Sequence, residues 1–256
     1  MKTSNKLLLG LAAVIVIGIT LLIFAGLPHI VARHLAGVIH GNGNLVNSEI
    51  DISDFEDIEL NISAIVFYRQ NSDSSASLRV HTDENIMNAL EIKTIEGRLC
   101  IDVKGDSAIS PSELTIYVNS RSLKGAVVSG SGKIHLNGNV NVPAVSITIR
   151  GSGSFLTENL FCEQISASIL GSGYVELKGA SNSASFAITG SGNLNASDYL
   201  VQHATCAITG SGNIRANAVE TIDASITGSG NITYFGNPHS VHSSVKGSGN
   251  IQHAGA

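Results

Sequence analysis

Residues 206–214 read Cys-Ala-Ile-Thr-Gly-Ser-Gly-Asn-Ile, and variants of this stretch occur seven times along the 256-residue chain. The Gly-Ser-Gly tripeptide returns at steps of 21, 20, 19, 20, 18 and 19 residues, and it begins at Gly130, Gly151, Gly171, Gly190, Gly210, Gly228 and Gly247. A short fixed period indicates a stack of similar supersecondary units, because one such unit cannot bury its own apolar face. We therefore expect residues 126–256 to form seven regular repeat coils.

Apolar residues alternate with polar residues on both sides of the tripeptide, which is the spacing of strands and not of helices. Two residues before the first glycine stand only β-branched residues: Val128, Ile149, Ile169, Ile188, Ile208, Ile226 and Val245. Four residues after it stand Ile134, Phe155, Val175, Leu194, Ile214, Ile232 and Ile251. We expect both columns, and the residues four and six positions before the glycine, to face inward.

Two architectures are compatible with a unit of strand, tight turn, strand and looser turn. Antiparallel pairing within each unit would give a meander, whereas stacking of one unit on the next would give parallel strands about 4.8 Å apart. Equivalent positions keep the same residue class in all copies, which favours stacking in register. The sequence thus predicts an all-β fold: a single-stranded, right-handed parallel β-helix, or β-solenoid.

The turn residues are the candidate special positions of this solenoid. Glycine weakens a strand, so its retention in two columns indicates a corner with positive φ or close backbone approach. The second glycines are Gly132, Gly153, Gly173, Gly192, Gly212, Gly230 and Gly249. Asparagine follows the tripeptide in four copies, Asn193, Asn213, Asn231 and Asn250. These side chains form either an amide ladder along the stack or ordinary solvent-exposed turns.

The front of the chain contains a run of 21 residues without a charge, Leu7 to Leu27, after Lys2 and Lys6. Such a run is long enough to cross a bilayer as a helix and too long for the apolar part of a cleaved signal peptide. We predict an uncleaved single-pass anchor at residues 7–27, with residues 1–6 in the cytoplasm and the body of the protein outside. Residues 28–44 are expected to be an irregular juxtamembrane linker.

Residues 45–125 alternate like strands but lack the tripeptide and carry more charge. We expect them to be irregular opening coils of the same solenoid, covering an end that would otherwise expose an unpaired strand edge.

From the Gly41-Asn42-Gly43 stretch through Ser53–Ile58 and Glu96–Leu99 to the Gly-Ser-Gly-Asn-Ile copies, the chain resembles the putative auto-transporter adhesins with a head GIN domain. The resemblance covers about residues 45 to 253. It implies an all-β solenoid in a bacterial envelope, held by the anchor in the inner (plasma) membrane with its body periplasmic or extracellular. The family brings no catalytic residues.

Composition and spacing argue against several kinds of chemistry. A net charge of −5 with 14% charged residues does not suit a nucleic-acid surface. No column stacks two carboxylates on adjacent coils, so we do not expect an enzyme. His239, His242 and His253 crowd the last coil without a spacing that aligns their rings, and no metal or cofactor site is predicted. Cys100, Cys162 and Cys206 form no metal-type pair, and no disulfide that the fold requires is expected.

Aromatic residues, only 5% of the chain, offer few platforms for a sugar. Within the repeats the candidates are Phe155, Tyr174, Tyr199, Tyr234 and Phe235, of which Phe155 should face inward and Tyr174 outward.

Two functions remain open. The first is an exposed binding or adhesion module whose partner is a surface glycan or an envelope protein. The second is an envelope scaffold in which copies stack end to end through an uncapped last coil.

Overall fold

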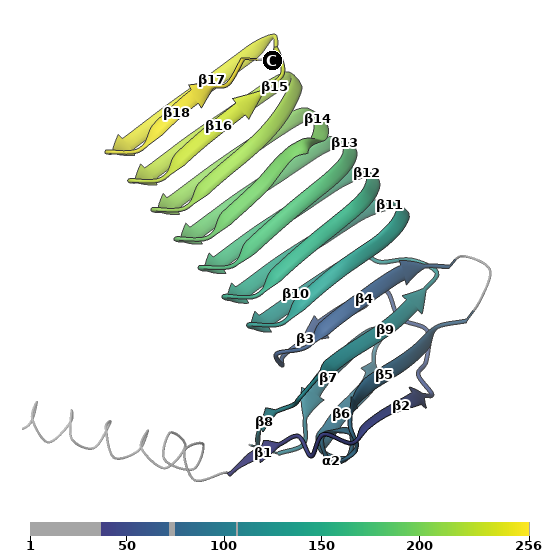
Figure 1. Ribbon diagram of the computed structural model, residues 1–256. Helices are drawn as coiled ribbons and strands as arrows, with labels where there is room; N and C mark the ends of the chain where they lie inside the picture. Colours follow the sequence, from purple (N-terminus) through teal and green to yellow (C-terminus); the bar gives the residue numbers. More distant parts are fainter. Residues whose placement is uncertain (1–36, 72–74, 106, 256) are drawn as a thin grey trace, which may run out of the picture.

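The computed structural model describes residues 37–71, 75–105 and 107–255. Over this part of the chain the protein is almost entirely β-structure, stacked along one axis (Figure 1). No helix in the described ranges is long and apolar enough to cross a bilayer. The span predicted at residues 7–27 lies outside these ranges and stays a prediction.

The repeat region is a parallel solenoid. Its strands are β10 (Gly125–Gly130), β11 (Lys133–Gly151), β12 (Ser154–Gly171), β13 (Tyr174–Gly190), β14 (Asn193–Gly210), β15 (Asn213–Gly228), β16 (Asn231–Phe235), β17 (Ser240–Gly247) and β18 (Asn250–His253). Each long strand bends between two Gly-Ser-Gly corners and pairs in parallel with the next, so that Ile188, Ile208 and Ile226 are direct neighbours. The predicted stacking is confirmed.

The inward columns form the core. Ile208 is 2% exposed, and its polar neighbour Thr209 faces solvent. Burying each such β-branched side chain contributes about 1.5–3 kcal/mol, and the repeat supplies one in nearly every coil. The inward columns lose their burial only in the last coil, where Val241 and Val245 are both 42% exposed. Among the described residues, no further strand covers that coil.

Residues 37–125 differ from the expected series of opening coils. Their elements are β1 (Val38–His40), β2 (Leu45–Ile50), β3 (Asp57–Leu60), β4 (Ile65–Gln70), β5 (Ser77–Asp83), α2 (Glu84–Ala89), β6 (Leu90–Ile95), β7 (Arg98–Val103), β8 (Ala108–Ser110) and β9 (Leu114–Ser120). Here β3 and β4 form the coil that touches the repeats, and β7 and β9 form the coil below it, all in parallel.

The remaining strands close the lower end of the stack. β6 pairs with β7, β5 with β9 and β2 with β5, all antiparallel. Successive windings therefore do not follow sequence order below β10, because the chain leaves the stack after β4 and returns to it through β7. An antiparallel layer covers the end of the stack without a continued parallel repeat, which is why this segment lacks the tripeptide.

The linker predicted at residues 28–44 lies within the described ranges only from residue 37 on. Residues 38–40 form β1, which pairs with β8. The Asp83 carboxylate binds the backbone just after β1. Asp83, fully buried, accepts hydrogen bonds from the Gly43 amide at 2.7 Å, the Ser112 amide at 2.7 Å and the Ser112 hydroxyl at 2.9 Å. Desolvation acts to raise the pKa of Asp83, but these hydrogen bonds prevail and hold it below its ordinary value.

Candidate functional site

The fourteen predicted turn glycines lie at the solenoid corners. From Gly151 on, a Cβ in the first column would meet the backbone of the preceding coil, as a Cβ in the second column would, and the first column also has positive φ. The first glycine of every tripeptide has positive φ, from 96° at Gly130 to 133° at Gly171. The second glycine packs closely against the preceding coil. A Cβ at Gly212 would be 2.6 Å from the Gly192 carbonyl oxygen and 2.7 Å from Ile188 Cγ2. Both columns are thus required for coil-to-coil packing.

The corner backbone is also occupied by hydrogen bonds between coils. The Ser211 amide donates to the Gly190 carbonyl at 2.8 Å, and the Asn213 amide donates to the Gly192 carbonyl at 3.1 Å. The corner amides therefore serve the stack instead of forming an anion-binding nest.

The asparagine column forms a short amide ladder. Asn213 Nδ2 donates to Asn193 Oδ1 at 2.8 Å, and Asn231 Nδ2 donates to Asn213 Oδ1 at 2.9 Å. Asn250 departs from the ladder and donates to Gln252 Oε1 at 3.1 Å. These exposed amides satisfy each other's hydrogen-bonding groups, so their role is structural.

The histidines of the last coil do not converge. His239 Nδ1 lies 2.9 Å from Glu220, His242 Nδ1 lies 3.2 Å from Asp223, and the His253 ring stacks on Tyr234. Within the described ranges, no group of three histidine, cysteine or acidic side chains is placed to hold a metal ion.

All three cysteines are free thiols. Burial raises the pKa of the Cys206 thiol to about 12. Burial also raises the pKa of the Cys162 thiol, whose sulfur lies 3.3 Å from the Tyr199 hydroxyl. Neither thiol is therefore an activated nucleophile.

A site that the sequence did not reveal lies where the closing strands meet the solenoid. We call it the aromatic groove: Glu49, Phe67, Tyr68, Arg69, Ser77, Arg79, Tyr117, Val118, Asn119, Asn137 and Gly138 line a hollow of about 530 Å³. Its volume is within the range of small-ligand sites. The residues come from β2, β5, β9, β4 and β11, which lie side by side (Figure 1).

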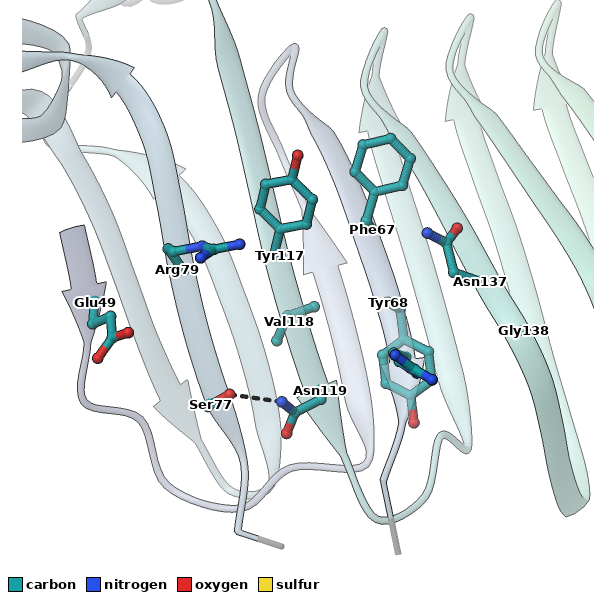
Figure 2. Close-up of a pocket in the computed structure, with 11 residues that line it drawn as sticks. Glu49, Phe67, Tyr68, Ser77, Arg79, Tyr117, Val118, Asn119, Asn137 and Gly138 are labelled. Atoms are coloured by element: carbon teal, nitrogen blue, oxygen red, sulfur yellow. Dashed lines mark hydrogen bonds between the residues drawn. The ribbon is translucent and has the colours of Figure 1, made fainter. Parts of the chain in front are cut away.

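One wall of the groove is a row of outward-facing rings. In register across the strands, Arg79 lies opposite Tyr117, Tyr117 opposite Phe67, and Phe67 opposite His135. The Phe67 and Tyr117 rings stack with centroids 5.5 Å apart and planes 19° apart, and the His135 ring lies 5.8 Å from Phe67. The Arg79 guanidinium lies 5.1 Å from the Tyr117 ring centroid, and Figure 2 shows Arg79, Tyr117 and Phe67 following one another.

Polar groups complete the groove. Asn119 Nδ2 donates to Ser77 Oγ at 2.6 Å (Figure 2). The Oδ1 atoms of Asn119 and Asn137 are buried and have no hydrogen-bond partner among the described residues. A buried acceptor without a partner costs free energy, so an incoming hydroxyl group would be favoured here.

The described lining of the groove offers groups that can bind a ligand. Glu49 is the single carboxylate among its described lining residues, so no acid–base pair of carboxyl groups is present. The rings can stack on a ligand, the guanidinium groups can pair with its negative charge, and the amides can form hydrogen bonds with it.

The sequence did not lead to this site because its two rings are brought together by the non-sequential stacking of β4 and β9. Of the aromatic residues considered within the repeats, Phe155 and Tyr199 are fully buried, and Tyr174 is 36% exposed. A usable signal was present only for Tyr117, which stands between Ile116 and Val118 of an alternating run, so its strand phase is outward.

Comparison with known proteins gives a consistent assignment. The family described as "Putative auto-transporter adhesin, head GIN domain" matches residues 54–238. A Bacteroides fragilis structure described as a putative adhesin superposes with a TM-score of 0.79 at 24% identity, covering 84% of this chain and 100% of that one. The level of identity supports a shared fold.

Two further structures are similar. A Parabacteroides distasonis protein described as a putative lipid binding protein has a TM-score of 0.70 at 31% identity, covering 85% of this chain and 100% of its own. A putative adhesin from Parabacteroides merdae has a TM-score of 0.65 at 26% identity, covering 86% and 100%. No curated protein matches the chain.

Proposed function

The chain belongs to the family described as putative auto-transporter adhesin, head GIN domain, and on that premise we propose that it is a non-enzymatic binding module that holds saccharide chains in the aromatic groove. The observation that carries the proposal is the exposed Phe67–Tyr117 stack. Tyr117 is 42% exposed, and stacked rings on a rigid sheet present a preformed flat apolar surface beside polar groups.

The proposed setting is the cell envelope. In this proposal the apolar run at residues 7–27 anchors the chain in the inner membrane, and the solenoid projects outward as a rigid stalk. The groove lies at the end of the described stack from which β1 leads back toward residue 37 (Figure 1). Resistance of the chain to alkaline extraction from membranes supports the anchor, and complete release contradicts it.

A glycan array probed with the labelled full-length chain in mild detergent tests the saccharide proposal. Tyr117→Ala removes half of the exposed stack, and truncation of a central aromatic anchor weakens binding by roughly 30-fold. Tyr174→Ala is the matched control, since it deletes another exposed tyrosine, on β13 and outside the groove lining.

Two outcomes of the glycan array would contradict the saccharide proposal. Absence of any bound glycan, or equal binding by the Tyr117 and Tyr174 variants, refutes the proposal. The relative described as lipid binding makes phospholipid vesicles a necessary parallel arm. Vesicle binding that depends on Tyr117, without glycan binding, would assign the groove to lipid instead.

A second candidate function is the end-to-end scaffold, which the outermost described coil favours. β17 pairs only with β15 and β18 only with β16, so one edge of each has no strand partner among the described residues. Val241 and Val245 remain exposed beside that edge. Filaments seen by negative-stain microscopy at micromolar concentration would support a scaffold, and a monomer by light scattering would exclude it.

A further inference from the structure

We infer that the ligand of the aromatic groove is an anionic saccharide whose acidic groups are held by Arg79 and Arg69. The inference rests on the proposed saccharide function and adds the chemical class of the sugar. Its basis is that both arginines are among the residues that line the hollow containing the ring stack.

Within the described ranges, neither guanidinium group forms an ion pair with a carboxylate. The arginine ion pairs within 4.0 Å among the described residues are Arg98 with Glu59 and Arg121 with Asp54. Neither Arg69 nor Arg79 takes part in one of these pairs. Arg79 lies against the Tyr117 ring, which orients its planar fork without engaging its hydrogen-bond donors. These donors match the geometry of a carboxylate or sulfate group.

The local charge differs in sign from that of the whole chain. The net charge of the chain is −5, and yet the described lining residues of the groove include two arginines and one acidic residue, Glu49. Glu49 lies opposite Arg79 in the β2–β5 register but beyond ion-pair distance from it. The described lining of the groove therefore has a formal charge of +1, opposite in sign to that of the whole chain.

The two arginines lie on either side of β9. Arg79 is opposite Tyr117 on one side, and Arg69 is opposite Asn119 on the other. Two strand spacings and two residues along a strand place their Cα atoms roughly 12 Å apart. This separation suits a chain of sugars lying across the strands better than one small anion.

The amides account for the sugar part of the ligand. Asn119 Oδ1 and Asn137 Oδ1 are buried acceptors without a hydrogen-bond partner among the described residues, and rotation of either amide into the hollow would let it accept a hydrogen bond from a hydroxyl group. Inorganic phosphate or sulfate at neutral pH supplies no such array of hydroxyl donors together with a face for Phe67 and Tyr117. The groove thus combines groups for charge, for hydroxyls and for a flat apolar face.

Calorimetric titration of the full-length chain tests the inference with three probes. They are a uronic-acid oligosaccharide, the same oligosaccharide with its carboxyl groups reduced to alcohols, and a sulfated oligosaccharide with the reduced backbone. We expect the two acidic probes to bind about tenfold more tightly than the reduced one, a preference that weakens at high salt.

The variants separate charge recognition from sugar recognition. Arg79→Gln and Arg69→Gln should each lower the preference for the acidic probes while the reduced probe binds as before. Tyr117→Ala should weaken all three probes. Arg150→Gln, which removes an exposed arginine on β11 outside the groove lining, is the matched control and should change nothing.

The titrations distinguish failure of the anionic inference from failure of the saccharide proposal. Equal affinity for the acidic and reduced probes overturns the anionic inference and leaves the saccharide proposal standing. Failure of all three probes to bind overturns both. Preference for only one of the two acidic probes supports the inference and identifies the acidic group.

Discussion

Replacing the first glycine of a tripeptide by alanine should have different consequences in adjacent coils, although the Gly-Ser-Gly tripeptide is the same. Gly130 and Gly151 are in register, and both have positive φ, 96° and 113°. A Cβ at Gly130 would meet nothing within 4 Å. A Cβ at Gly151 would lie 2.8 Å from the Gly130 carbonyl oxygen and 3.3 Å from the Gly130 Cα and amide nitrogen.

The structure sets the size of the difference. Gly130→Ala imposes only the backbone cost of positive φ on an L-residue, about 1–2 kcal/mol. Gly151→Ala imposes a similar cost and also forces two backbones apart, which adds about 1–3 kcal/mol by analogy with overpacked cores. Backbone atoms held by coil-to-coil hydrogen bonds cannot move aside as a flexible side chain does.

Urea unfolding of the two variants, followed by far-UV circular dichroism, compares their free energies of unfolding. Unfolding of a repeat array need not be all-or-none, so amide hydrogen exchange of the peptides around residues 130 and 151 gives a local measure. We expect a lower urea midpoint and faster exchange for Gly151→Ala. Equal midpoints and equal exchange would show that close backbone approach does not explain the glycine column.

Two further predictions concern the core and the closing end. Ile208→Asp should lower the free energy of unfolding by several kcal/mol, because it buries an unpaired charge. Thr209→Asp should change that free energy by about 0.5 kcal/mol or less. Equal urea midpoints for the two variants would contradict the assigned inward face. The lowered pKa of Asp83 means that its ionised form stabilises the fold above its unfolded-state pKa of about 4, and that this stability is lost as the pH falls through the folded-state pKa. Thermal unfolding between pH 7 and pH 3 should therefore show an acid loss that Asp83→Asn reduces, while a wild-type acid profile in the variant would refute this role.

The repeat architecture could be predicted because every coil contacts its neighbours in the same way. A residue class that returns at one position of each unit meets its own equivalent one coil away, as Ile188 meets Ile208. Local alternation therefore decides burial without knowledge of any distant contact. The ladder between Asn193, Asn213 and Asn231 follows from the same translation along the axis.

The closing end could not be predicted by that reasoning, because its strands do not stack in sequence order. Alternation in Leu114-Ile116-Val118 places Tyr117 on an outward face, but the all-apolar run Ile65–Tyr68 does not fix the side of Phe67. Nor does alternation say which strand lies beside which. β4 lies between β9 and β11, although β9 follows it by more than 40 residues in the chain.

The sequence by itself determined the winding, its inward columns and its glycine corners, because these depend on short-range periodicity and on contacts between consecutive units. Only the tertiary structure decided the antiparallel closure and the aromatic groove. The physical reason is that these depend on pairing between segments far apart in the chain, for which no repeated pattern specifies the partner.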